Sequence, residues 1–285
     1  MSEHTLQQRL LHFAMQSVDT ALGKVQYRQA GLASAAHTCV LLHGIGSASA
    51  SWLAQLEAAS KSPDTRVLAW DAPGYGETQA VPAAQPVATD YAQRVWAWLD
   101  ALHLTSSITL VGHSLGAIMA ASAARLQPKR VQQLVLLAPA QGYGAASETL
   151  RQQKRDDRLK NLQTLGPAGM AEKRASAMLS SHASSEYIAF VQSVMAQVNV
   201  AGYTQATHLL AQSDVLTDLK QWSGPLVVAS GRADTITPAS GCQALAQACD
   251  VAWHDLGDVG HACALEAAPA VNALLQLNSP NKASA

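Results

Sequence analysis

Residues 110–118 read Leu-Val-Gly-His-Ser-Leu-Gly-Ala-Ile, and this stretch decides the fold. An apolar strand breaks at Gly112 and resumes as a helix after Gly116, which is the Gly-x-Ser-x-Gly pattern of a sharp strand-to-helix turn. Ser114, at the tip, takes a backbone conformation that residues with a β-carbon seldom adopt. The two glycines remove side chains that would collide there. The pattern therefore predicts a serine hydroxyl that stands alone, as a nucleophile requires.

A second loop has the composition of an anion-binding turn. The apolar run 39–42 ends in His43-Gly44-Ile45-Gly46, which predicts a strand followed by a glycine-rich loop. Such a loop can point backbone N–H groups at a developing oxyanion.

A carboxylate and an imidazole follow two later strands. The apolar run 226–230 leads into a loop that contains Asp234, and the strand-like run 251–254 precedes His261. Both residues follow Ser114 in the chain, so the order of the three is Ser, Asp, His.

With these motifs the chain resembles the α/β-hydrolase superfamily from about residue 25 to residue 277. The nucleophile, acid and base of that family follow in the order Ser, Asp, His, as they do here. Residues 71–78 look like the family's Asp-x-Pro-Gly-x-Gly-x-Ser turn, with Thr78 in place of serine, and Trp52 follows the oxyanion loop as in many members. The resemblance implies an α/β-hydrolase fold, in which helices flank a mostly parallel central sheet and a helical cap is inserted.

The order of apolar patterns predicts how the chain is divided. Residues 1–138 and 223–285 alternate strands with helices, which indicates right-handed crossovers, and we interpret them as the α/β-hydrolase core. Residues 139–222, which we call the insertion, have helical patterns without strands and are expected to form a cap. Within it, residues 152–160 are strongly charged and predict a solvated helix face. The apolar residues of the insertion that could line a cavity are Met170, Met178, Tyr187, Phe190, Met195, Tyr203 and Leu209.

The resemblance implies a role for each motif residue. Ser114 would be the nucleophile, His261 its general base and Asp234 the acid that orients the imidazole. The backbone N–H groups of Ile45 and Leu115 would form the oxyanion hole. We expect the supporting residues to shape the catalytic loops rather than to take part in the chemistry; they are His43, Gly44, Gly46 and His113.

Other carboxylates compete for the role of the acid. Asp255 and Asp258 are closer to His261 in sequence than Asp234 is, but they lie on or just after the last predicted strand and could simply cap it. Asp71 ends a strand and is expected to anchor the glycine turn that follows.

The composition limits the classes of partner that the protein can have. The chain has 285 residues, 48% of them hydrophobic, and a formal net charge of −1. It can bury a large core. The absence of excess basic charge argues against nucleic acid or an anionic membrane as a partner. The first 16 residues lack the continuous apolar core of a signal peptide, and no stretch has transmembrane length, so a cytoplasmic location is expected. The oligomeric state is left open.

Cysteine and histidine spacing predicts no metal site, and the chemistry expected of Ser114 requires no cofactor. Cys242 and Cys249 would lie about 10 Å apart on a helix, too far for a disulfide. Cys263 follows His261 by two residues and is expected to be the cysteine that can be reached from the site.

The sequence predicts the type of bond that is cleaved less specifically than it predicts the catalytic residues. A carboxylic ester or lactone of a small, largely apolar acid is favoured. Carbon–carbon hydrolases of aromatic ring-cleavage products are similar in their loop and cap, but they typically carry Asn and Trp where this chain has His113 and Ala262. A non-catalytic protein that binds a small molecule and an acyltransferase of the same fold are the remaining alternatives.

Overall fold

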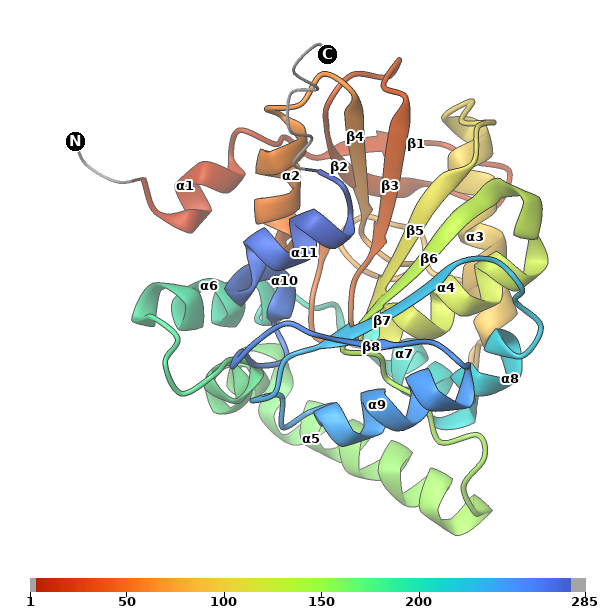
Figure 1. Cartoon of the computed structure of the whole chain (residues 1–285). Coiled ribbons are helices and arrows are strands. Elements are labelled where there is room, and N and C mark those ends of the chain that lie inside the picture. The colour runs from red at the N-terminus through yellow and green to blue at the C-terminus, as the bar shows by residue number, and fades with distance from the viewer. Residues whose placement is uncertain (1–3, 278–285) are drawn as a thin grey trace.

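A computed structural model describes residues 4–277, so residues 1–3 and 278–285, at the ends of the two predicted core segments, lie outside it. Its centre is an eight-stranded sheet in the order β1-β2-β4-β3-β5-β6-β7-β8 (Figure 1). The β1–β2 and β2–β4 pairs are antiparallel, and the other neighbouring pairs are parallel. This mostly parallel sheet confirms the predicted fold class. The strands are β1 (Gln16–Val18), β2 (Val25–Ala30), β3 (His37–Leu42), β4 (Thr65–Trp70), β5 (Ile108–His113), β6 (Val131–Leu137), β7 (Leu226–Ser230) and β8 (Trp253–Asp255).

Helices cover both faces of the sheet because the buried strands are apolar on both sides. In β3, Cys39 and Leu41 pack with Trp52 on one face, whereas Val40 and Leu42 join the cluster on the other face. The helices of the core are α1 (Leu6–Leu10), α2 (Leu53–Ala59), α3 (Ala88–Ala101), α4 (Leu115–Leu126), α9 (Ala239–Ala248), α10 (Cys263–Glu266) and α11 (Ala268–Leu274). Residues of α2, α10 and α11 belong to the first cluster, and residues of α3 and α4 to the second. Single 3₁₀ turns occur at Ser49–Trp52, Pro128–Arg130 and Ser176–Met178.

Between β6 and β7 the chain forms four helices: α5 (Glu148–Arg174), α6 (Ser185–Met195), α7 (Val200–Gln212) and α8 (Val215–Leu219). Helix α5 is interrupted at Gly166, whose φ of 63° and ψ of 175° are not helical. Figure 1 shows α5 along the bottom of the molecule and α6 at its left side. The segment between β6 and β7 is therefore helical, and α5 has two arms that meet at Gly166.

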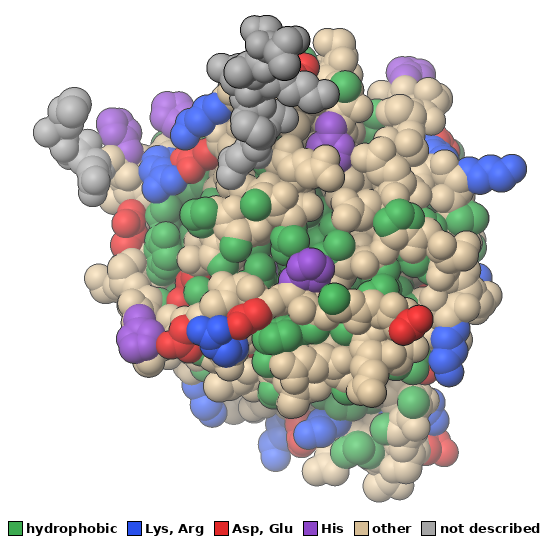
Figure 2. Space-filling view, viewed as in Figure 1, with side chains coloured by type: hydrophobic (Ala, Val, Ile, Leu, Met, Phe, Trp, Pro, Cys, Tyr) green, Lys and Arg blue, Asp and Glu red, His purple; other side chains and the backbone are tan. Residues whose placement is uncertain are grey.

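Charge is spread over the visible surface. On the face drawn in Figure 2, basic and acidic side chains are interspersed, and neither sign gathers into a large patch. Within residues 4–277, no helix combines the length and apolar character needed to cross a bilayer.

Candidate active site

Ser114 sits in the strained turn that the sequence predicts. Its φ of 53° and ψ of −119° lie in a region that residues with a β-carbon rarely occupy. Three backbone hydrogen bonds hold it there, from Ser114 N–H to the Leu137 carbonyl and from the N–H groups of Ala117 and Ala140 to the Ser114 carbonyl. A β-carbon at Gly112 would come within 2.4 Å of the Gly116 carbonyl oxygen, so strand and helix can meet this closely only without a side chain there.

The loop after β3 lies directly against this turn. A β-carbon on Gly44 would be 2.9 Å from the Ser114 β-carbon. The Ile45 carbonyl accepts a hydrogen bond of 2.8 Å from the Tyr75 hydroxyl, which fixes the peptide between Ile45 and Gly46. Among residues 4–277, no acceptor takes the backbone N–H of Ile45 or of Leu115. Both of the predicted oxyanion-hole N–H groups therefore lack an acceptor within the described part of the protein.

His43 makes hydrogen bonds within this loop and to the turn after β4. Its Nε2 accepts a 2.9 Å hydrogen bond from the Ala72 backbone, and its Nδ1 lies 2.8 Å from the Gly44 carbonyl, to which it donates. Burial lowers the pKa of His43 and outweighs the nearby charge of Asp71, so the imidazole is neutral. A neutral ring satisfies one donor and one acceptor in the loop.

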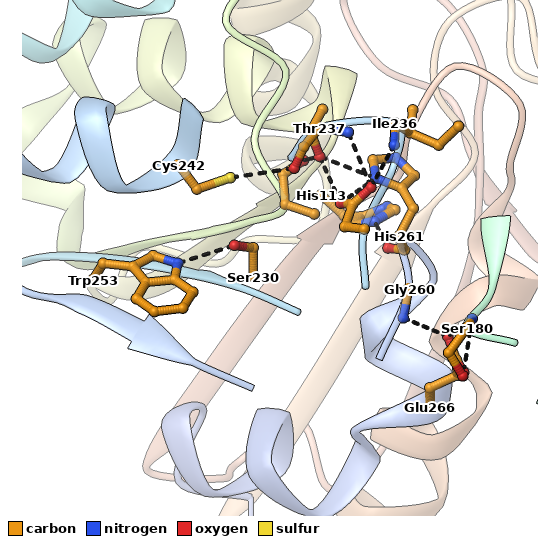
Figure 3. Close-up of polar contacts among 12 residues, drawn as sticks. His113, Ser180, Ser230, Ile236, Thr237, Cys242, Trp253, Gly260, His261 and Glu266 are labelled. Carbon is orange, nitrogen blue, oxygen red and sulfur yellow. Dashed lines mark hydrogen bonds and ion pairs between the residues drawn. The ribbon is translucent and has the colours of Figure 1, made fainter. Parts of the chain in front are cut away.

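His261 and Asp234 form a buried pair. His261 Nδ1 lies 2.9 Å from Asp234 Oδ2, and their side chains are 1% and 0% exposed. Asp234 Oδ1 accepts hydrogen bonds from the backbone N–H groups of Ile236 and Thr237, at 2.7 and 3.0 Å (Figure 3). Burial alone would raise the pKa of Asp234, but the hydrogen bonds from His261 and Thr237 outweigh it and lower that pKa. The carboxylate is therefore charged beside the imidazole.

Thr237 was not anticipated from the sequence. Its hydroxyl lies 2.7 Å from Asp234 Oδ2, 3.1 Å from His261 Nδ1 and 3.0 Å from the Ala138 carbonyl oxygen. The available signal was the Asp-x-x-Thr spacing, because a side chain three residues after an aspartate can return to it across a turn.

The competing carboxylates lie elsewhere. Asp255 pairs with Arg232 and accepts from the Gly257 N–H, whereas Asp258 lies 3.4 Å from the exposed His182. Asp71 accepts a 2.7 Å hydrogen bond from the Ser49 N–H through its side chain, and its carbonyl accepts one of 2.8 Å from the Thr78 hydroxyl. Asp71 thus anchors its turn as expected, and of these carboxylates only Asp234 is in contact with His261.

His113 ends β5 and supports the backbone of His261. Its Nε2 donates a 2.8 Å hydrogen bond to the His261 carbonyl, and the two rings lie 4.8 Å apart between centroids. Burial, reinforced by the nearby His261, lowers the pKa of His113 to about 3. His113 is thus a neutral positioning group, consistent with its expected supporting role.

Glu266 joins the insertion to the loop that carries His261. Its carboxylate accepts hydrogen bonds from the Ser180 hydroxyl at 2.6 Å, from the Ser180 N–H at 3.0 Å and from the Gly260 N–H at 2.8 Å (Figure 3). The Ala262 N–H also donates to the Met178 carbonyl, at 2.7 Å. The residues on either side of His261 are therefore fixed to the insertion.

Ser114 and His261 line the same cavity, which has a volume of about 250 Å³. The core lines it through residues that follow strand ends, and the insertion lines the rest. Although the elbow places its hydroxyl at the cavity, Ser114 is only 6% exposed. Of the apolar insertion residues predicted as candidates, those that line this cavity are Met170, Met178, Met195 and Tyr203. Tyr187, Phe190 and Leu209 do not, because they pack in apolar clusters.

The expectation for the cysteines was wrong, and two arginines of α5 border the cavity although the sequence did not indicate them. Cys263 is completely buried and does not border the cavity, whereas Cys242 does, because α9 turns its first residues toward the loop of Thr237. In the stretch expected to be solvated, Arg158 borders the cavity, and so does Arg174 later in α5.

No cluster of three or more His, Cys, Asp or Glu side chains that could hold a metal ion occurs within the described part of the chain.

Residues 39–268 match the alpha/beta hydrolase fold family, to which the chain therefore belongs. The abhydrolase domain-containing protein abhd-5.2 of Caenorhabditis elegans is 31% identical over 111 residues, which are 38% of this chain and 24% of that protein. The chain thus spans about a quarter of the length of that relative.

Two further relatives match over more of their length. The (E)-2-((N-methylformamido)methylene)succinate hydrolase of Acinetobacter baylyi is 27% identical over 210 residues, 70% of this chain and 68% of that protein. The crystal structure of the enol-lactonase from Burkholderia xenovorans LB400 superposes with a TM-score of 0.78 at 20% identity, over 92% of this chain and 99% of that one. The latter likeness concerns the fold.

Proposed function

We propose that the protein is a serine hydrolase that cleaves a small carboxylic ester or lactone through an acyl-enzyme on Ser114. The observation that carries the proposal is the buried His261–Asp234 pair, whose imidazole borders the same cavity as Ser114. Because Nδ1 of His261 is bonded to Asp234, Nε2 is the nitrogen left to take the Ser114 proton.

The reaction uses side chains and backbone alone. Ser114 Oγ attacks the acyl carbon while its proton passes to His261, and the Asp234 carboxylate stabilises the imidazolium. The N–H groups of Ile45 and Leu115 hold the oxyanion, each contributing about 3 kcal/mol to transition-state stabilisation. His261 then protonates the leaving oxygen, and a water deprotonated by His261 releases the acid and restores Ser114. No cofactor or metal takes part.

Cavity size and composition favour a small substrate. The cavity of about 250 Å³ is below the ~300–1,000 Å³ usual for drug-sized ligands. In this proposal residues 139–222 act as a cap on the core formed by 1–138 and 223–285, and the methionines of the cap enclose the substrate. An enol-lactonase shares the fold, and a relative is named for hydrolysis of a succinate derivative.

The alternative functions would use the same cavity and the same residues Ser114, Asp234 and His261. A carbon–carbon hydrolase must ketonise a dienol and expel a carbanion, and we expect His113 and Ala262, in place of Asn and Trp, to support this poorly. An ester or lactone expels an oxygen that His261 protonates directly. Acyl transfer to an acceptor other than water follows the same first half-reaction. A binding protein without catalysis would have no use for a charged Asp234 held against His261.

A hydrolysis screen tests the proposal. It should compare p-nitrophenyl esters of increasing chain length, lactones and ring-cleavage dienoates. We expect kcat/KM for short aryl esters or lactones to exceed that for any dienoate by at least ~10-fold, or about 1.4 kcal/mol. A dienoate that is turned over faster than every ester and lactone would replace this proposal with carbon–carbon hydrolysis. No turnover of any compound would favour the binding protein.

A further inference from the structure

Two arginines of the insertion border the cavity of Ser114, and they carry an inference that rests on the proposed function. We propose that the substrate bears a carboxylate in addition to the bond that is cleaved, and that Arg158 and Arg174 bind this carboxylate.

The bend in α5 allows both arginines to reach one cavity. They are 16 residues apart in sequence, a span of about 24 Å in a straight helix. Gly166 lies midway between them, with a φ of 63° and a ψ of 175° that are tolerated essentially only by glycine. Each arm of α5 therefore contributes one arginine to the wall of a cavity of about 250 Å³.

Neither arginine has a hydrogen-bond or ion-pair partner among the residues that the structure describes. In residues 4–277 every arginine except Arg151, Arg158 and Arg174 donates to a carboxylate, amide or carbonyl oxygen. Arg151 does not border the cavity. Arg158 and Arg174 are both half-buried. Partly buried guanidinium groups without acceptors are costly, and an incoming anion would remove that cost.

The rest of the cavity wall matches an anion with an apolar body. Among the described residues, no aspartate or glutamate borders the cavity. Most of the other insertion residues in the wall are apolar, including Met170, Met195 and Val198. A guanidinium group can donate two parallel hydrogen bonds to one carboxylate, and a weakly hydrated cation suits a partly buried site. Binding there would hold the acyl group in register with Ser114, which lies on the core side.

Matched esters test this inference. Mono-4-nitrophenyl glutarate is compared with 4-nitrophenyl pentanoate, and 3-acetoxybenzoate with its methyl ester, so that the carboxylate lies on the acyl side in one pair and on the alcohol side in the other. We expect kcat/KM for the acid to exceed that for its neutral partner by at least ~10-fold in one pair, as charge-assisted hydrogen bonds allow. Added NaCl should reduce this preference in the unmodified protein.

The matched variants remove two positive charges each from the same helix. Arg158→Gln/Arg174→Gln should lower the acid-to-neutral ratio by ~10-fold or more. Lys160→Gln/Lys173→Gln, at exposed neighbours that do not border the cavity, should change it by less than ~2-fold.

Each outcome decides between the two proposals. Hydrolysis of the neutral esters without a preference for either acid would overturn this inference alone. So would a preference that survives in the arginine variant, or a preference that is insensitive to salt. Failure of the unmodified protein to hydrolyse any of the four esters or a lactone would overturn the proposed function itself and this inference with it.

Discussion

The two walls of the cavity are built differently. On the core wall, Ser114 and Asp234 are held by several short hydrogen bonds from the backbone, and Gly44 contacts the serine directly. On the insertion wall, methionine side chains border the same space together with two arginines that have no partner within residues 4–277. A methionine side chain can adapt its shape, and a guanidinium group without a partner can reorient. A strained backbone turn that is held by hydrogen bonds keeps one conformation. This difference indicates that the core wall is suited to catalysis and the insertion wall to substrate recognition.

The largest expected effect is on the core wall. Ser114→Ala should lower kcat by ~10⁴-fold or more, because no other group can form the acyl-enzyme. The free energy of unfolding should stay close to that of the parent, since only the hydroxyl oxygen is removed. Ser122→Ala is the control, because this hydroxyl in α4 is buried and has no hydrogen-bond partner within residues 4–277. Retained turnover in Ser114→Ala would place the nucleophile elsewhere.

Asp234→Asn should lower kcat by ~10⁴-fold, because the His261 imidazole loses the acceptor that orients it and the charge that stabilises its protonated form. Asp258→Asn should change kcat by less than ~2-fold, since this carboxylate is exposed and pairs with the exposed His182. Steady-state kinetics on the best ester in the screen would measure both. If Asp258→Asn were the more damaging change, Asp234 would lose its assigned role.

His113 predicts how stability depends on pH. Its folded pKa is about 3, below the ordinary histidine value of 6.5, so between these values the unfolded chain binds a proton that the folded chain does not. Stability is therefore greatest above pH 6.5 and falls with acidification, by up to about 1.4 kcal/mol per pH unit. His43, whose pKa is also lowered, acts in the same direction.

Urea unfolding at pH 7, 6 and 5 measures this slope. His113→Asn should flatten it, while His254→Asn, an exposed control, should leave it unchanged. Equal slopes in the parent and His113→Asn would mean that His113 accepts a proton in the folded protein.

Glu266 connects the two walls, and its removal should have a smaller effect. Glu266→Ala should lower the free energy of unfolding by about 1–3 kcal/mol, because the Ser180 and Gly260 donors lose a charged acceptor. It should also lower kcat by up to ~10-fold, because Gly260 precedes His261. Glu172→Ala, exposed on α5, is the control. Unchanged stability and kcat would show that the insertion is attached to the core by other contacts.

The core wall could be predicted from the sequence because its residues have backbone requirements. Gly112, Gly116 and Gly44 remove side chains at close approaches, and such requirements leave a local pattern. The insertion wall has no such pattern. Arg158 was assigned to solvent because its neighbours are charged, and only the bend at Gly166 and the packing of α5 bring it to the cavity. Thr237 was missed because its role depends on a turn that closes around Asp234.

The central claim is that Ser114, on the core wall, is the nucleophile. Its most direct test is to treat the protein with a fluorophosphonate and to locate the adduct by peptide mass spectrometry. We predict a single adduct on Ser114, formed because His261 and the N–H groups of Ile45 and Leu115 activate that hydroxyl alone. Modification of a different serine, or persistent labelling in Ser114→Ala, would contradict the account.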